Sequence, residues 1–289
     1  MNGKEVFISG GSGTLGNELV RYIKKNYEPR GIRVFSRSEL RQARMETELK
    51  EEGLNENVEF IVGDIQNERK IRLAMRGVDI VIHTAALKRI DTAEKDPLEC
   101  ININILGTQN VVYASLEQKV EKAILISTDK AVYPITLYGY TKGCAESLFL
   151  NANVYSGKVG PKFSVIRYGN VIDSNGSVIE IFKRQVAKGL PITITDPAMT
   201  RFWIKAEEVV RFICESVSDD SDCRLYIPKM RSSTIKDLAD VIAPFEPKQI
   251  IGLRCNEKMH EVISEDTWSS DSELLMDKEE LTEFLHGCI

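Results

Sequence analysis

A glycine-rich segment near the start of the chain constrains the fold most strongly. In GGSGTLG, Gly10, Gly13 and Gly16 recur at three-residue spacing. The apolar run EVFISG (5–10) before them predicts a strand, and TLGNELVRYIKKN (14–26) after them has the apolar spacing of a helix. Glycines at such a junction let the backbone approach a pyrophosphate, and the helix N-terminus attracts its negative charge. The segment therefore predicts a dinucleotide site, although three glycines alone would also suit a tight turn.

The following part of the chain continues this alternation of strands and helices. Further strands are expected at 31–37, 57–64, 78–86, 120–127 and 162–169, with helices at 39–53, 68–77, 98–118 and 139–155. The strands are continuous apolar runs, which are typical of a parallel sheet buried on both faces. We therefore predict an α/β fold, with a Rossmann-like doubly wound parallel sheet over residues 1–170 that carries the cofactor and the catalytic residues.

Beyond Asn170 the alternation becomes irregular. Helices are expected at 177–189, 206–217 and 234–244, separated by prolines. We predict a small C-terminal lobe over 171–289 that binds the substrate and is interleaved with the first domain. The acidic stretch at 264–287 is predicted to be a solvated tail.

The net charge, the lengths of the apolar stretches and the cysteine and histidine content argue against several classes of protein. A formal net charge of −5 gives no general basic face for nucleic acid. No apolar stretch is long enough to cross a bilayer, and no secretory signal pattern is present, so we expect a cytoplasmic protein without a membrane partner. The six cysteines form no Cys-x-x-Cys pair and should be reduced thiols, and the three scattered histidines predict no metal site.

The residues after the second and third strands bear on the choice of cofactor. In FSRSEL, the hydroxyls of Ser36 and Ser38 flank Arg37, and a guanidinium there could neutralise the 2′-phosphate of NADP. Glu39 leaves NAD as the alternative, because an acid there could bind a ribose 2′-hydroxyl. NADP is the prediction. Asp64 could accept a hydrogen bond from the adenine amine or cap the next helix.

The segment STDKAVYPITLYGYTK (127–142) carries a Tyr-x-x-x-Lys motif at a helix start. Residues four apart share a helix face, so Lys142 can lie beside Tyr138 and lower the pKa of its phenol. Tyr138 could then accept a hydroxyl proton while hydride leaves for a nicotinamide, and Thr128 could hold the same substrate oxygen. Tyr140 is an alternative inside the motif. The motif and the glycine loop together resemble the short-chain dehydrogenase/reductase superfamily.

The adjacent pair Asp129 and Lys130 suggests a further step, because oxidation and reduction at one carbon need no such pair. Once carbon 4 of a hexose is a ketone, the carbon 5 proton is acidic and Lys130 could remove it. Asp129 could protonate the oxygen that leaves carbon 6. A nucleotide-sugar 4-epimerase, the alternative function, has no elimination step and no need of the pair. Taken alone, the two residues could simply form an ion pair on the surface. A third alternative is a cofactor-sensing module without activity, which would be expected to lack Tyr138 or Lys142.

Five longer motifs make the resemblance more specific. They are HTAALKRIDTAEKDPLECININILGTQNV, STDKAVYPITLYGYTK, RYGNVIDSNGSVIEIF, ITDPAMTRFWI and NEKMHEV, in that order. Together they resemble the nucleotide-sugar 4,6-dehydratases that act on UDP-N-acetylglucosamine, from about residue 4 to 263. The resemblance implies tightly bound NADP that is regenerated in each turnover, with NAD less favoured, and a homodimer or higher homo-oligomer built on the helices around 98–118 and 139–155.

The resemblance also implies site residues by position. The catalytic residues would be Thr128, Asp129, Lys130, Tyr138 and Lys142. The cofactor-binding residues would be Gly10, Gly13, Thr14, Leu15, Gly16, Ser36, Arg37, Ser38, Asp64, Ile65, Ala85, Ala86, Lys88, Tyr138 and Lys142. The substrate-binding residues would be Lys88, Asn170, Ser177, Arg201, Arg254 and Glu257, the last three near the diphosphate and uridine ribose.

Two departures from the family pattern affect the expected substrate site. The usual Arg-Pro-Gly-Glu-Lys appears here as RCNEK (254–258), and the C-terminal lobe is expected to be shorter than usual. An Asp-Lys pair is typical of the group that inverts carbon 5, whereas retaining relatives usually carry Asp-Glu. The altered loop and lobe leave the configuration at carbon 5 open.

Overall fold

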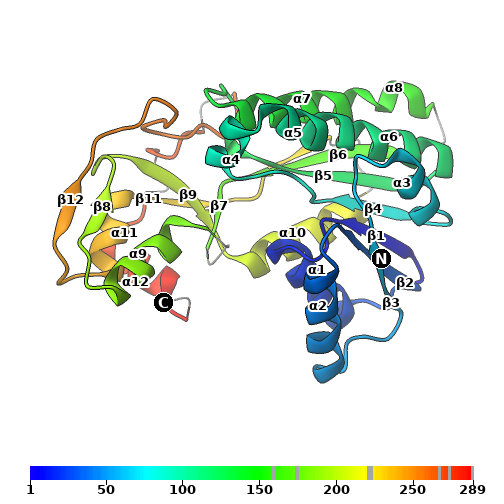
Figure 1. Ribbon diagram of the computed structural model, residues 1–289, viewed down its shortest axis with the longest axis horizontal. Helices are drawn as coiled ribbons and strands as arrows, with labels where there is room; N and C mark the ends of the chain where they lie inside the picture. Colours follow the sequence, from blue (N-terminus) through cyan, green and yellow to red (C-terminus); the bar gives the residue numbers. More distant parts are fainter. Residues whose placement is uncertain (158–159, 173–175, 220–223, 266–267, 273–274, 288–289) are drawn as a thin grey trace. The chain divides into compact units, whose positions relative to one another are not determined.

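Figure 1 shows the computed structural model of the chain, which describes residues 1–157, 160–172, 176–219, 224–265, 268–272 and 275–287. The chain divides into two compact units. The first comprises Met1–Ser127, Thr136–Arg167 and Glu207–Tyr226, and the second comprises Thr128–Ile135, Tyr168–Ala206 and Ile227–Ile289. The expected division of cofactor and substrate binding between domains 1–170 and 171–289 stays a prediction.

The first unit is built on a seven-stranded sheet in the order β10-β6-β5-β4-β1-β2-β3. The strands are β1 (Glu5–Ser9), β2 (Gly31–Ser36), β3 (Val58–Val62), β4 (Ile80–His83), β5 (Lys122–Thr128), β6 (Lys162–Tyr168) and β10 (Leu225–Tyr226). The pairs β1–β2, β1–β4, β2–β3, β4–β5 and β6–β10 are all parallel. This confirms the predicted Rossmann-like doubly wound sheet, with the order reversing at β1 and β4, where such folds bind ligands.

Helices cover both faces of this sheet (Figure 1). One face carries α1 (Thr14–Asn26), α2 (Glu39–Glu51) and α10 (Ala206–Ser218). The other carries α3 (Glu68–Ala74), α4 (Ile90–Lys95), α5 (Pro97–Ile101), α6 (Gly107–Gln118), α7 (Leu137–Asn151) and α8 (Asn153–Ser156). Most residues of the central strands are apolar because both faces of the sheet are covered there, as the full burial of β1 and β5 shows.

The helix expected at 98–118 is interrupted by a π-helical turn, Asn102–Leu106, between α5 and α6. The turn presents the buried amide of Asn104. This amide accepts a hydrogen bond from the N–H of Leu87 (2.8 Å) and donates to the carbonyl of Leu87 (3.2 Å) and the hydroxyl of Thr141 (3.0 Å). Wider turns of this kind re-aim one side chain within a helix. Asn104 thereby joins the loop after β4 to α7.

The second unit contains two small sheets packed with helices. β7 (Asn170–Val171), β9 (Thr200–Ile204) and β11 (Arg231–Thr234) form one sheet in the order β11-β9-β7, and β8 (Ile192–Ile194) pairs with β12 (Lys248–Ile250). The helices are α9 (Val178–Ala187), α11 (Ile235–Ile242) and α12 (Lys278–Leu285). Their buried faces share one apolar core that includes Phe182, Trp203, Leu238 and Leu281.

The prediction of a solvated tail over 264–287 is wrong for α12. Asp277 and Glu280 form a reciprocal capping box that starts the helix. Leu281 and Leu285 are buried in the core of the second unit. Two apolar residues four positions apart on one helix face are enough to bury it, but the surrounding acids hid this short stripe in the sequence.

The described residues contain neither a membrane-spanning helix nor a metal-binding cluster. No helix among them is long and apolar enough to cross a membrane. Within the same residues, no cluster of three or more His, Cys, Asp or Glu side chains has the arrangement to hold a metal ion. The cytoplasmic location and the absence of a nucleic-acid partner stay predictions.

Candidate active site

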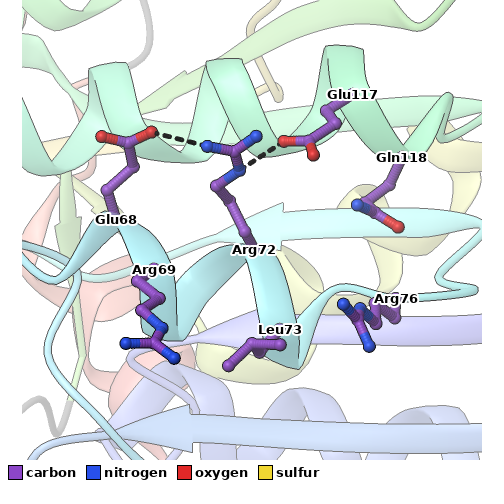
Figure 2. Close-up of a pocket in the computed structure, with 7 residues that line it drawn as sticks. All are labelled: Glu68, Arg69, Arg72, Leu73, Arg76, Glu117 and Gln118. Atoms are coloured by element: carbon purple, nitrogen blue, oxygen red, sulfur yellow. Dashed lines mark hydrogen bonds and ion pairs between the residues drawn. The ribbon is translucent and has the colours of Figure 1, made fainter.

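A surface hollow lies on α3 and α6, away from the predicted site residues in the sequence. It is lined by Glu68, Arg69, Arg72, Leu73, Arg76, Glu117 and Gln118 (Figure 2). Arg72 bridges the carboxylates of Glu68 and Glu117 across it. All three side chains are about half exposed, so solvent screens these charges. None of the predicted site residues lines this hollow.

The glycine loop forms a close approach of backbone segments in the first unit. Gly10 has a φ of +69°, and a Cβ there would lie 2.8 Å from the backbone of Ala85. A Cβ on Gly16 would lie 2.5 Å from the Cα of Gly11, so neither position has space for a side chain. Helix α1 follows Gly13, which offers no side-chain cap, and its first turn carries no acid. Such a helix start fits a dinucleotide pyrophosphate.

The predicted NADP residues lie at the end of β2. Arg37 is 58% exposed, and its Nη1 lies 3.3 Å from Glu99 Oε1 and 3.6 Å from Asp64 Oδ2. The hydroxyl of Ser36 accepts a hydrogen bond from a serine of the glycine loop, while Ser38 caps α2. An exposed guanidinium held between two carboxylates suits neither cofactor exclusively, so the NADP-binding role of this segment stays a prediction.

Other predicted cofactor residues have local roles in the first unit. Asp64 accepts a hydrogen bond from the N–H of Gln66 (2.9 Å) in a turn, and Asn67 caps α3, so the alternative capping role expected for Asp64 is wrong. Ile65 is buried, and Lys88 is exposed in the loop that Asn104 holds through Leu87. Contacts of Ile65, Ala85, Ala86 and Lys88 with a cofactor stay predictions.

Helix α7 presents the Tyr-x-x-x-Lys motif. Tyr138 is 8% exposed and packs against Ala93 and Cys100, whereas Tyr140 is 59% exposed. Lys142 is buried, and its Nζ donates to the carbonyl of Ile126 in β5 at 2.7 Å. Burial lowers the pKa of Lys142 to about 8, although a nearby carboxylate partly opposes this. Burial thus favours Tyr138 over Tyr140 as the tyrosine of the motif.

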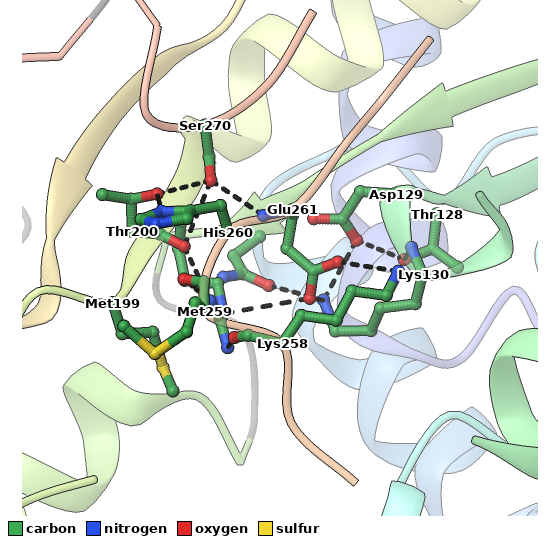
Figure 3. A network of polar contacts seen from close by, with 12 residues as sticks. Thr128, Asp129, Lys130, Met199, Thr200, Lys258, Met259, His260, Glu261 and Ser270 are labelled. Carbon is green, nitrogen blue, oxygen red and sulfur yellow. Dashed lines mark hydrogen bonds and ion pairs between the residues drawn. The ribbon is translucent and has the colours of Figure 1, made fainter. Parts of the chain in front are cut away.

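The second unit holds the Asp129–Lys130 pair, in the 3-10 turn that follows β5 (Figure 3). Asp129 is fully buried, and its Oδ1 accepts hydrogen bonds from Thr128 Oγ1 (2.9 Å) and Lys130 Nζ (3.0 Å). Lys130 Nζ also donates to Asn170 Oδ1 at 3.3 Å. The structure therefore brings Thr128, Asp129, Lys130 and the predicted substrate residue Asn170 together. Among the described residues, Asp129 Oδ2 is buried without a hydrogen-bond partner.

Two residues of this cluster were missed at the sequence level, Lys258 and Glu261. Glu261 is buried, with Oε1 4.0 Å from Lys130 Nζ and Oε2 3.3 Å from Lys258 Nζ. Burial alone would lower the pKa of Lys130, but the carboxylates of Asp129 and Glu261 outweigh it and raise that pKa. Both missed residues lie in the motif NEKMHEV, whose charged side chains were the available signal.

The remaining predicted substrate residues have structural partners in the second unit. Arg201 is buried and donates to the carbonyls of Thr200, Lys258 and Met259. Arg254 is exposed, with its N–H 3.4 Å from a carboxylate oxygen of Glu257. Ser177 caps α9. Substrate contacts of Ser177, Arg201, Arg254 and Glu257 stay predictions.

His83, at the end of β4, was also missed. It is fully buried, with Nδ1 2.6 Å from the hydroxyl of Ser9 and Nε2 3.0 Å from that of Thr108. Burial, together with the charge of Lys142, lowers the pKa of His83 to about 3. The imidazole is therefore neutral in the folded chain and joins β1, just before the glycine loop, to α6. The sequence did place this histidine inside an apolar strand, which could have indicated that it is buried.

His83 should make stability depend on pH. Its folded pKa lies below the ordinary value of 6.5, so its contribution is complete above pH 6.5 and is lost as pH falls towards 3. We expect the free energy of unfolding to fall by up to about 1.4 kcal/mol per pH unit from this group. His83→Gln should remove this slope in denaturant titrations between pH 6.5 and 4.5, whereas the exposed His286→Gln should keep it. Equal slopes for both variants would contradict the assignment.

Comparison with known proteins identifies the family. Residues 6–279 match the family described as "Polysaccharide biosynthesis protein". The inverting UDP-N-acetylglucosamine 4,6-dehydratase of Campylobacter jejuni (strain 81-176) is 42% identical over 264 residues, covering 91% of this chain and 78% of that protein. The UDP-glucose 4-epimerase of Rickettsia akari is 38% identical over 277 residues, covering 93% and 80% respectively. A solved structure, Pen from Bacillus thuringiensis, has a TM-score of 0.92 at 31% identity and covers 99% of this chain and 98% of that one. These likenesses confirm the resemblance found in the motifs, and the chain belongs to the polysaccharide biosynthesis protein family.

Proposed function

We propose that this chain is a UDP-N-acetylglucosamine 4,6-dehydratase, which converts its substrate to a UDP-4-keto-6-deoxy-N-acetylhexosamine. The observation that carries the proposal is the buried ion pair between Asp129 and Lys130, next to Thr128 and Asn170. The Campylobacter jejuni relative named for this activity supports the substrate class. A surface ion pair would leave both charges in water. The Asp129 carboxylate is instead fully buried, which costs desolvation free energy that its partners have to offset.

The first stage would be oxidation at C4. A nicotinamide, when bound, accepts a hydride from C4 and later returns it to C6. Tyr138 would take the proton from the C4 hydroxyl, and Thr128 would hold that oxygen. Lys142 would place a positive charge near Tyr138 and so favour the phenolate. Its pKa of about 8 leaves most of this amine charged at neutral pH.

The second stage would be loss of water across C5 and C6. Lys130 would take the C5 proton and Asp129 would give its proton to the departing C6 oxygen. These roles require a neutral amine and a protonated carboxyl. One proton moving from Lys130 Nζ to Asp129 Oδ1, across the observed 3.0 Å hydrogen bond, creates both forms without exchange with solvent. The elimination then restores the ion pair, with the proton on Lys130. Return of the hydride to C6 is balanced by one proton added at C5, so the whole reaction loses one water molecule.

A nucleotide-sugar 4-epimerase is the second candidate, since the Rickettsia akari relative carries that name. An epimerase would use the glycine loop, Thr128, Tyr138 and Lys142 and would have no task for Asp129 and Lys130. The buried pair therefore favours the dehydratase. An Asp-Lys pair and the "inverting" name of the Campylobacter jejuni relative also favour inversion at C5.

The function is tested by incubating the purified chain with UDP-N-acetylglucosamine and recording the mass of the product. We expect a product lighter by one water molecule, with one deuterium at C5 when the reaction runs in deuterated water. The C5 configuration, read from proton coupling constants, should be inverted. A product of unchanged mass with the opposite C4 configuration would show an epimerase and contradict the proposal.

Tyr138 and Tyr140 provide a matched pair for the oxidation step. Tyr138→Phe should lower product formation by about a hundredfold or more, because no group remains to take the C4 hydroxyl proton. Tyr140→Phe, on the exposed side of α7, should keep the wild-type rate. Initial rates at saturating substrate measure both. A large loss in Tyr140→Phe with activity retained in Tyr138→Phe would reverse the assignment.

The cofactor is proposed to be NADP, tightly held and regenerated in each turnover. The support is the glycine loop, which fits a pyrophosphate, and the exposed guanidinium of Arg37 at the end of β2. A bound 2′-phosphate would compete with Asp64 and Glu99 for the guanidinium of Arg37. NAD is the alternative.

Arg37→Asp tests this choice, with Arg69→Asp as the control of equal charge change on α3. Arg37→Asp should weaken NADP binding at least about tenfold more than NAD binding, because it places an anion against the 2′-phosphate. Arg69→Asp should affect the two cofactors equally. Titration of each variant with NADP and NAD measures the ratio. Equal losses for both cofactors in Arg37→Asp would show that Arg37 does not bind the phosphate.

A homodimer is proposed for the assembly. Several large apolar side chains are exposed on α5 to α8 and the π-helical turn of the first unit, namely Leu98, Leu106, Tyr113, Tyr140, Val154 and Tyr155. Exposed apolar side chains on neighbouring helices are typical of a protein interface. Light scattering should give twice the mass of one chain. Tyr113→Glu should reduce that mass, whereas Leu40→Glu, at an exposed position of α2, should not; a wild-type monomer would contradict the proposal.

A further inference from the structure

We propose that Glu261 is a positioning residue for Lys130, which holds the amine in place and controls how readily it releases its proton. This inference rests on the proposed function, in which Lys130 takes the C5 proton. Glu261 is separated from the STDK segment by more than a hundred positions in the sequence, and the proposed mechanism gives it no role. Figure 3 shows its carboxylate beside the amine of Lys130, in the same group of charges as Asp129.

Glu261 is fixed by the chain around it. Its N–H donates to the hydroxyl of Ser270 at 2.9 Å. The preceding residues are tied on both sides, since Arg201 donates to the carbonyl of Lys258 (2.9 Å) and Lys258 Nζ donates to the carbonyl of Val132 (2.7 Å). Val132 directly follows the 3-10 turn that contains Lys130. Segment 258–261 is therefore attached to the same turn by a backbone contact and by a side-chain charge.

Glu261 has three cationic neighbours, the amines of Lys130 and Lys258 and the guanidinium of Arg201. Four charged groups face one another here, the carboxylates of Asp129 and Glu261 and the cations of Lys130 and Lys258, with Arg201 beside them. Both Nη atoms of Arg201 donate to backbone carbonyls, and its Nε stays 4.0 Å from Glu261. Arg201 thus braces the segment through its Nη atoms, and its Nε shares Glu261 Oε1 with Lys130 at the same distance, while Lys258 contacts Oε2.

This arrangement gives Glu261 an effect on proton transfer. A negative charge near an amine favours the ammonium form, which is the form that Lys130 reaches after taking the C5 proton. The Asp129 and Glu261 carboxylates already raise the pKa of Lys130 against the effect of burial, while Arg201 opposes them. Asp129 would lose its own proton during elimination, so Glu261 supplies the carboxylate that takes no part in bond breaking. Lys258 limits its strength by partly neutralising it.

The test measures deuterium uptake at C5 against pH in the purified enzyme with UDP-N-acetylglucosamine. Exchange at C5 needs only the neutral amine, so uptake should rise above the level that internal transfer to Asp129 supports as Lys130 loses its proton to solvent. Glu261→Gln should move the midpoint of this rise to lower pH, because it removes a negative charge from the ammonium, and should lower the plateau by about tenfold or more. Asp271→Asn is the matched control, since its half-exposed carboxylate faces His260 at 4.0 Å, and it should leave the midpoint unchanged.

A second variant reverses the expected sign. Lys258→Met removes the cation that partly neutralises Glu261, so it should move the midpoint to higher pH, and Glu261→Asp should stay closer to wild type than Glu261→Gln. A merely structural role for Glu261 would lower the plateau without moving the midpoint. Wild-type midpoints in Glu261→Gln and Lys258→Met would overturn the inference while the dehydratase proposal stands. Absence of C5 uptake in the wild type would overturn both together.

Discussion

The candidate chemistry depends on one buried ion pair, that between Asp129 and Lys130. Placing a fully buried carboxylate in a short turn costs desolvation free energy of several kcal/mol, and one lysine contact seldom offsets it. The second unit supplies the rest, with the Thr128 hydroxyl on the same oxygen and the Asn170 amide on the lysine. The cluster is therefore a group of mutually dependent polar contacts, in which removing Thr128, Asp129, Lys130 or Asn170 takes a partner away from another member.

Two lysines of the candidate site illustrate how partners decide a pKa. Lys142 has a backbone carbonyl as its hydrogen-bond acceptor, so burial dominates and lowers its pKa to about 8. Lys130 has carboxylates as neighbours, and they raise its pKa despite burial. The difference suits the proposed roles, since Lys142 has only to present a charge to Tyr138 whereas Lys130 has to accept and keep a proton. Within the proposed mechanism, the two lysines therefore have different tasks because their environments differ.

The parts of the structure that follow from local patterns could be predicted, and those that depend on distant partners could not. The glycine loop and α1 have their boundaries written in glycine spacing and apolar periodicity, and the expected helix at 14–26 matches α1. The π-helical turn could not be predicted, because its cause is the contact of Asn104 with Leu87 and Thr141. The role of Glu261 could not be predicted either, because it also depends on contacts with residues distant in the sequence. A glutamate in a polar motif resembles any surface acid until the fold brings it to Lys130.

The central claim, that Asp129 and Lys130 carry out an elimination after C4 oxidation, is tested most directly with Lys130→Met. Methionine keeps the length of the side chain and removes the base. The account predicts that this variant still binds UDP-N-acetylglucosamine and transfers hydride from C4, seen as near-ultraviolet absorbance of reduced cofactor in single-turnover experiments. It should place no deuterium at C5 and should lose water at least about a hundredfold more slowly than wild type. Dehydration by Lys130→Met at the wild-type rate would contradict the account and leave the pair a structural feature.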